Sequence, residues 1–131
     1  MATLTREQIL KSKDLKVEAV DVPEWGGKVH VRELTAWERE QFEKRIAATG
    51  GTVAQIHKTL GDLRVSLVVH CLVDENGERL FQDNDAKALN EKSATVITRL
   101  FGICSRISGI SQEVVDAAVG ESATTLEGTS S

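Results

Sequence analysis

The sequence contains little cysteine, proline or aromatic residue, and these scarcities exclude several classes of protein. Its 131 residues include two cysteines, one proline, no tyrosine and only 4% aromatic residues. Two cysteines without a repeated spacing cannot form the disulfide framework of a small secreted protein. No basic segment followed by an apolar one opens the chain, so we expect no signal peptide. We therefore expect a soluble protein of the cytosol.

Positive charge and long apolar runs are also scarce. Residues 1–64 carry 11 basic and 10 acidic side chains (+1), whereas residues 65–131 carry 5 and 10 (−5), for a net charge of −4. A general nucleic-acid binder needs a basic patch that displaces counterions. The uncharged run over residues 65–73 is nine residues long, far short of the roughly 20 that span a bilayer. We expect neither nucleic acid nor a membrane as a partner.

Three segments match the capping box, in which a threonine is followed three residues later by glutamate or glutamine. The threonines are Thr5, Thr35 and Thr52. In this motif the hydroxyl accepts from the third backbone N–H, and the third side chain accepts from the backbone N–H of the cap residue, so each match predicts a helix start. The expected helices cover residues 6–12, 36–48 and 53–73.

The sequence between the first two helices predicts a β-hairpin over residues 16–34. Residues 28–34 begin with the polar–apolar alternation of a half-buried strand. Residues 16–22 are rich in β-branched side chains but alternate less clearly, so we expect a bulge or an exposed edge there. Between the two strands, Pro23 presets φ for a turn, and the two glycines of this segment allow positive φ.

The helix expected over residues 53–73 changes character along its length. Up to Arg64 its apolar side chains form a stripe, and beyond Arg64 they lie on all sides. A helix that is apolar all round must be covered all round. Either this segment is the central helix of the fold, or a partner covers it as a docking surface. The candidate partner-binding residues of the segment are Val65, Val68, Val69 and Leu72.

The second half predicts short helices and a tail. Asn76 and Gly77 favour a chain reversal, after which Leu80 and Phe81 are expected to return to the core. Beyond Gly120 there is little to bury, so residues 120–131 should be disordered. The remaining helices are expected over residues 84–91, 94–108 and 112–119. The fold class is therefore mainly helical α+β, with a hairpin before a helical body, and we expect a single domain over residues 1–119.

The residues that could bind a metal are better explained as structural. Zinc would need Cys and His at short spacings, but the adjacent His70 and Cys71 point about 100° apart on a helix. Cys71 and Cys104 are therefore expected as small core residues on two packed helices. The acidic residues after position 73 approach calcium-loop spacing, but Arg79 stands where an EF-hand requires glycine. We expect no metal ion and no cofactor.

Catalytic motifs are not found, which leaves the tryptophans as the most informative side chains. The sequence contains no G-x-S-x-G nucleophile motif and no glycine-rich phosphate loop, so we assign no catalytic residue and expect no enzyme. Trp25 and Trp37 could stack together beneath the hairpin loop. Alternatively, Trp25 is an anchor that faces a partner, because tryptophan is enriched at the centres of interfaces.

The order of these segments resembles the tail assembly chaperones of long-tailed bacteriophages. The resemblance covers residues 4 to about 119 and rests on structural phrases in a fixed order. They are L-T-R-E-Q-I-L at 4–10, V-P-E-W-G-G-K-V-H-V-R-E-L-T-A-W-E-R at 22–39, C-L-V-D-E-N-G-E-R-L-F at 71–81, D-N-D-A-K-A-L at 83–89 and G-I-S-Q-E-V-V at 109–115. None of these phrases is a catalytic signature.

The resemblance implies a non-enzymatic protein of the infected host's cytoplasm. Chaperones of this family coat the tape measure protein until tail tube subunits polymerise around it, and they are absent from the mature virion. Many are also made in a longer form by ribosomal frameshifting, and the extension is thought to contact the tail tube protein. Coating a long client also implies self-association into oligomers. The alternative, from another class, is a small cytosolic adaptor or regulatory module that binds a protein partner.

Overall fold

The protein is described here by a computed structural model that covers residues 2–48 and 53–110, with the backbone alone for residues 53–60. The elements in chain order are α1 (Arg6–Lys11), β1 (Val17–Val22), the 3₁₀ turn η1 (Pro23–Trp25), β2 (Gly27–Arg32), α2 (Ala36–Ala47), α3 (Val53–Cys71), β3 (Leu72–Val73), the 3₁₀ turn η2 (Asp83–Asp85), α4 (Ala86–Leu89) and α5 (Ala94–Ile107). The fold class is the expected one, α+β and mainly helical. The Thr52 capping box, the helix expected over 112–119 and the tail over 120–131 lie outside the described residues.

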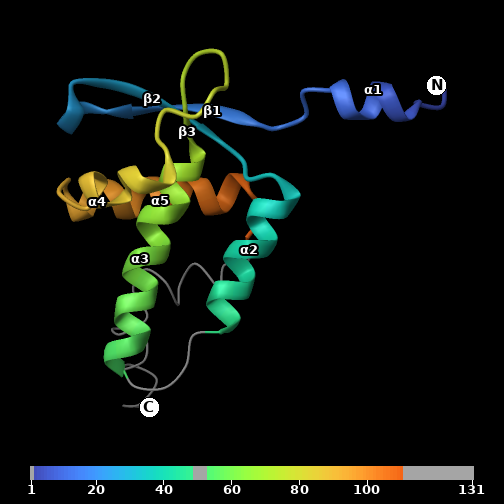
Figure 1. Ribbon diagram of the computed structural model, residues 1–131. Helices are drawn as coiled ribbons and strands as arrows, with labels where there is room; N and C mark the ends of the chain where they lie inside the picture. The colour runs from blue at the N-terminus through green and yellow to red at the C-terminus, as the bar shows by residue number, and fades with distance from the viewer. Residues whose placement is uncertain (1, 49–52, 111–131) are drawn as a thin grey trace, which may run out of the picture.

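A small antiparallel sheet covers one side of the helices (Figure 1). Its strand order is β1-β2-β3, so β1 is an edge strand, as one of the two expectations had it. The other expectation, a bulge, is wrong, because β1 and β2 pair one to one from Val17–Arg32 to Val22–Gly27. Of the two turn glycines only Gly26 has a positive φ, 77°, and Gly27 is already the first residue of β2.

The helix expected over residues 53–73 ends two residues earlier than predicted. Leu72 and Val73 leave the helix and form β3, which pairs with Val31 and His30 of β2. In the sequence, the apolar pattern on which the predicted helix rests continues through both residues. The backbone hydrogen bonds that an edge of the sheet offers to these two residues end the helix instead, so tertiary pairing overrides the local pattern.

The helix α5 crosses beneath the sheet and is fixed at both ends (Figure 1). The Ser93 hydroxyl accepts from the Val96 N–H at its start. At its end, Gly109 has φ 72°, and the N–H groups of Gly109 and Ile110 donate to the carbonyls of Arg106 and Ser105. This is the Schellman arrangement, which satisfies the last helical carbonyls.

The segment between β3 and α5 is less helical than the sequence predicts. Gly77, with φ 85°, permits the expected reversal, and the Asp74 carboxylate accepts from the Asn76 N–H at 2.8 Å. The helix expected over residues 84–91 is shorter and is divided into the 3₁₀ turn η2 and α4. Phe81 returns to the core as expected, but Leu80 is 50% exposed, because it lies just past the bridge that closes the turn.

The core lies between the sheet, α3 and α5. Phe101 of α5 is fully buried, and its ring centroid lies 6.1 Å from that of Phe42 on α2. The α5 end is also tied to the start of α2, since the Ser108 hydroxyl accepts from the Leu34 N–H at 2.9 Å. In the described part of the chain, no helix has both the length and the apolarity required to span a bilayer.

Candidate interaction surfaces

The most exposed apolar segment is the N-terminal arm, which we define as residues 4–16. Among the described residues, four of the seven exposed large hydrophobic side chains lie in this arm, and a fifth, Val17, directly follows it. The four are Leu4, Ile9, Leu10 and Leu15. The arm contains α1, which buries none of its residues and extends away from the body of the domain (Figure 1). The arm therefore offers apolar surface that the described domain does not use.

Local hydrogen bonds define α1 in the absence of packing. The Thr5 hydroxyl accepts from the Gln8 N–H at 3.2 Å, and the Gln8 side chain accepts from the Thr5 N–H at 2.9 Å, which is the predicted capping box. An isolated helix shorter than about 12 residues is marginal in water. A six-residue helix with exposed Ile9 and Leu10 therefore gains stability from any apolar surface that covers it.

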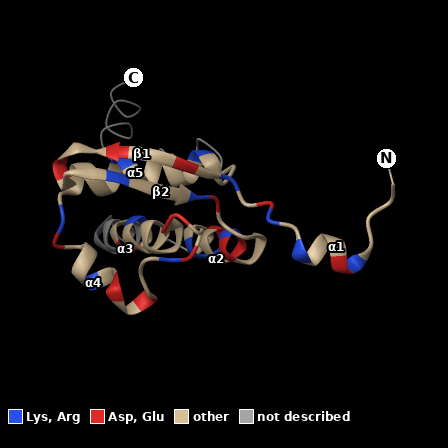
Figure 2. Ribbon diagram, turned by 90° about the horizontal axis from the view of Figure 1, so that it is seen from above, with Lys and Arg blue, Asp and Glu red and all other residues tan. Residues whose placement is uncertain are grey.

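The N-terminal arm is also basic. It contains Arg6, Lys11, Lys13 and Lys16 against Glu7 and Asp14, which gives a net charge of 4 − 2 = +2. Figure 2 shows α1 outside the body of the domain, with basic residues at both of its ends. The net charge of the arm is thus opposite in sign to that of the whole chain, which is −4.

Trp25, the tryptophan considered as a partner-facing anchor, lies half-buried beside a hollow of about 420 Å³. Apolar side chains of Phe81 and Leu89 line the same hollow together with Ala88. Glu24 at its edge forms a two-point ion pair with Arg99, with distances of 2.9 and 3.1 Å. Lys92 also lines the hollow, which is therefore mainly apolar with charged side chains at its edge.

The two tryptophans do not stack. Trp37 is 67% exposed at the start of α2 and borders a different, narrower hollow between α2 and α3, of about 50 Å³, with Leu34 and Leu67. Trp25 instead packs against the core from the hairpin turn. Of the two alternatives for the tryptophans, stacking beneath the hairpin loop is therefore wrong, because the turn η1 directs Trp25 toward the Phe81 side of the domain rather than toward α2.

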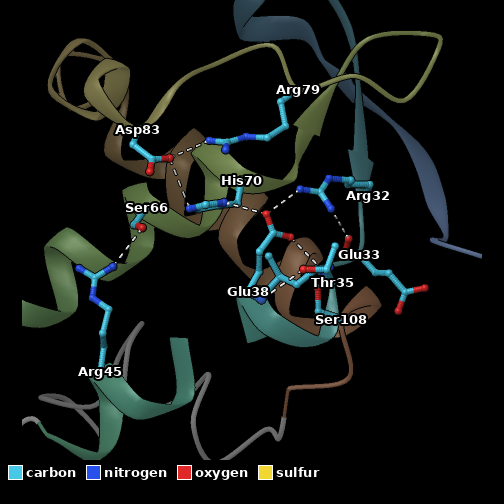
Figure 3. A network of polar contacts seen from close by, with 11 residues as sticks. Arg32, Glu33, Thr35, Glu38, Arg45, Ser66, His70, Arg79, Asp83 and Ser108 are labelled. Carbon is cyan, nitrogen blue, oxygen red and sulfur yellow. Dashed lines mark hydrogen bonds and ion pairs between the residues drawn. The ribbon is translucent and has the colours of Figure 1, made fainter. Parts of the chain in front are cut away.

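A polar network beside the Trp37 hollow joins β2, α2, α3 and the turn η2 (Figure 3). The Glu38 carboxylate accepts from the Arg32 guanidinium at 2.9 Å, and its Oε2 lies 2.9 Å from Nδ1 of His70. Its other oxygen accepts from the Thr35 N–H at 2.9 Å, which completes the predicted capping box of α2. Asp83 continues the network toward η2, 3.6 Å from His70.

The network stabilises the ionised form of Glu38. Burial disfavours the charged carboxylate, but the hydrogen bonds from His70, Arg32 and the Thr35 backbone outweigh it and hold the pKa of Glu38 well below its usual range. The side chains of Arg32 and Glu38 are only 8% and 13% exposed. This is a nearly buried ion pair, which fixes the start of α2 to β2 and α3.

Sequence reasoning did not find this network. The T-x-x-E pattern identified Glu38 as a helix-cap residue, but no spacing in the sequence connects it with Arg32 or His70. His70 lies 32 positions away and reaches Glu38 only because α3 packs against α2. A charged residue such as Arg32 on a strand next to a capping box is too common a pattern to predict an ion pair with the cap glutamate.

The four other candidate partner-binding residues lie in the core. Val65 is 5% exposed, and Val68, Val69 and Leu72 are at most 1% exposed. The helices α2, α4 and α5 pack against α3, so the burial of these four side chains favours the central helix over the exposed docking surface. The all-round apolar pattern thus reflects burial of these four side chains within the chain itself, although Ser66 and His70 of the same segment are partly exposed.

The two cysteines are core residues on two packed helices, as expected, and the structure adds that they are neighbours. Cys71 and Cys104 are both fully buried and free. Burial and the neighbouring Cys71 thiol raise the pKa of the Cys104 thiol well above its usual value. Within the residues that the structure describes, no three His, Cys, Asp or Glu side chains are grouped so that they could hold a metal ion.

Residues 5–119 match the family described as phage tail assembly chaperone. The match covers most of the chain, and the chain therefore belongs to the phage tail assembly chaperone family. Membership of a chaperone family indicates a non-enzymatic role. Comparison with curated proteins finds no significant match.

The fold is similar to a solved structure, that of the bacteriophage HK97 tail assembly chaperone. The two share 21% sequence identity with a TM-score of 0.63, over 77% of this chain and 94% of the HK97 chain. At this level of identity the similarity concerns the fold. It agrees with the family match and with the α+β architecture described above.

Proposed function

We propose that this protein acts as a tail assembly chaperone that binds the tape measure protein of its phage and keeps it soluble while tail tube subunits polymerise. The family match supports the chaperone class. The observation that carries the proposal is the apolar surface left uncovered by the domain, on the N-terminal arm and in the Trp25 hollow. Uncovered apolar surface marks sites of contact with other proteins.

In this proposal, the Trp25 hollow receives apolar side chains from a helix of the client. A client helix presents such side chains three and four positions apart along one face, the usual geometry of a helix that binds in a groove. Trp25 and Phe81 supply rigid apolar area at little cost in conformational entropy. The hollow and the apolar face of the client helix cover each other, and the net charge of −4 keeps the complex soluble.

The remaining parts of the proposed function concern where and with whom the chaperone acts. It works in the cytoplasm of the infected host, self-associates along its client and is absent from the mature virion. A longer form, made by ribosomal frameshifting, contacts the tail tube protein. Mass spectrometry of infected cells and of purified virions tests these parts: two products of one gene are expected in cells and neither in virions. A single product, or one that remains in the virion, contradicts them.

Co-expression with the tape measure protein tests the client interaction. The client is expected in the soluble fraction when the chaperone is in excess and in the pellet when it is absent. A client that precipitates despite excess chaperone contradicts the proposed function.

A blocking variant tests the hollow. Ala88→Arg places a long charged side chain in the Trp25 hollow without removing a core residue, since Ala88 is an exposed helical position. We expect the client to return to the pellet with this variant. Ala47→Arg, at the exposed end of α2, is the matched control and should keep the client soluble. Equal solubility with both variants excludes the hollow as the client site.

A further inference from the structure

The structure contains an uncovered arm that is apolar and basic. Elsewhere on the same chain it contains a hollow with an apolar lining and acidic residues at its edge. The hollow lies between β2 and the turn that follows β3, and its volume is about 470 Å³. It is lined by Val29, Val73 and Leu80, together with Asp74 and Glu75 from the turn. We call it the acid-rimmed hollow; Lys28 and His30 of β2 also line it. Its volume lies within the range of hollows that hold a small ligand or a few side chains.

We propose that the N-terminal arm of one chain binds in the acid-rimmed hollow of a second copy. The proposal rests on the self-association included in the proposed function and names the surfaces that carry it. Ile9 and Leu10 contact Leu80 and the apolar floor, and the lysines that follow lie against the acidic turn.

Charge complementarity selects a second copy as the occupant. The arm carries a net charge of +2, and Lys11 and Lys13 lie directly after its exposed apolar pair. The turn over residues 74–78 carries Asp74, Glu75 and Glu78, and no basic residue. Opposite charges around an apolar centre fix the register of a contact and disfavour the wrong partners.

The placement of the arm also favours a contact between molecules. In Figure 1 the arm extends away from its own body beyond the N-terminal end of β1, apart from the turn over residues 74–78. An arm that binds a neighbour leaves its own hollow free for the arm of another copy. Such a head-to-tail contact closes into a ring or continues as an open chain, depending on the rotation between copies.

The test uses two variants of the full chain that break opposite halves of the contact. Ile9→Asp/Leu10→Asp removes the apolar face of the arm, and Leu80→Asp places a charge in the hollow. We expect the wild-type mass, measured by light scattering, to rise with protein concentration. Each variant alone should stay monomeric, with a dissociation constant raised at least tenfold. Because all three residues are at least half exposed, both variants should keep the wild-type circular dichroism and Tm.

Mixing the two variants distinguishes this contact from other modes of assembly. The arm variant retains an intact hollow and the hollow variant an intact arm, so an equimolar mixture should form a complex of two chains that grows no further. Trp37→Asp, which removes another exposed apolar side chain, is the matched control and should assemble as the wild type does. A mixture that stays monomeric overturns the assignment.

Charge exchange tests the electrostatic half of the proposal. Lys11→Glu/Lys13→Glu should weaken assembly, and mixing it with Glu75→Lys/Glu78→Lys should restore it. Asp74 is kept because its carboxylate holds the turn. Wild-type protein that remains monomeric at all concentrations refutes the proposal. So does an arm variant that assembles normally but loses the client, which would assign the arm to the client and leave the proposed function intact.

Discussion

The ion pair between Arg32 and Glu38 allows a quantitative prediction for stability. Glu38→Gln keeps the size of the side chain and an oxygen that accepts from the Thr35 N–H, so the capping box survives. What the variant removes is the negative charge opposite the Arg32 guanidinium, whose side chain is 8% exposed. Removing one partner of a buried ion pair costs about 3–5 kcal/mol, because the other charge is left without compensation.

The expected magnitude lies at the lower end of that range. Glu38 retains some contact with solvent, so we expect the free energy of unfolding to fall by about 3 kcal/mol. For a domain of this size, that loss lowers Tm by about 12 °C. Thermal unfolding followed by circular dichroism at neutral pH measures the change directly.

A second glutamate of the same helix provides the control. Glu40 pairs with Lys44 at 3.1 Å, but its side chain is 57% exposed. Glu40→Gln should therefore cost about 0.5 kcal/mol or less, close to 2 °C in Tm. If Glu38→Gln destabilises the protein no more than Glu40→Gln does, the network is not the stabilising contact that its geometry indicates.

Three further predictions follow from the same structure. Because the pKa of Glu38 is lower in the folded state than its ordinary value of 4.5, its contribution to stability is complete above that pH and is lost as the pH falls. The free energy of unfolding of the wild type should thus drop more steeply from about pH 5 to about pH 2 than that of Glu38→Gln, and parallel curves would contradict this. Phe101→Ala should lower the free energy of unfolding by about 3–5 kcal/mol in chemical denaturation, because the ring is fully buried against Phe42. Leu10→Ala on the exposed arm should change it by less than about 0.5 kcal/mol. Equal effects of the two variants would contradict the assigned core. The buried Cys104 thiol has a raised pKa, so alkylation of the native protein should be slow and should speed up on unfolding. Rapid labelling in the native state would show that α3 and β2, which pack against α5, do not cover this thiol.

Several elements were predictable from short stretches of sequence. The starts of α1 and α2 follow from a threonine and the side chain three residues later, and both capping boxes are present. The end of α5 follows from Gly109, whose positive φ a side chain would oppose. In each case the deciding interaction lies within about four residues, so the local sequence contains all of its participants.

Surfaces were harder to predict than elements, as the segment over residues 65–72 shows. Its sequence fits both a central helix and a helix that a partner covers, because either arrangement would bury apolar side chains on every side. Only the positions of α2, α4 and α5 determine that Val68 is fully buried, whereas nothing in the described domain covers Leu10, which is 65% exposed. Hydrophobicity establishes that a side chain prefers to be covered, but it does not identify what covers it.

The sequence by itself determined the fold class, the hairpin, the main helix starts and the resemblance to a chaperone family, since these depend on local periodicity, capping and the order of short segments. The tertiary structure decided where α3 gives way to β3, which charges meet Glu38, that the two cysteines are neighbours and that the arm is left uncovered. These outcomes depend on contacts between residues far apart in the chain. Such contacts form only when the elements pack together, and no local pattern contains both of their partners.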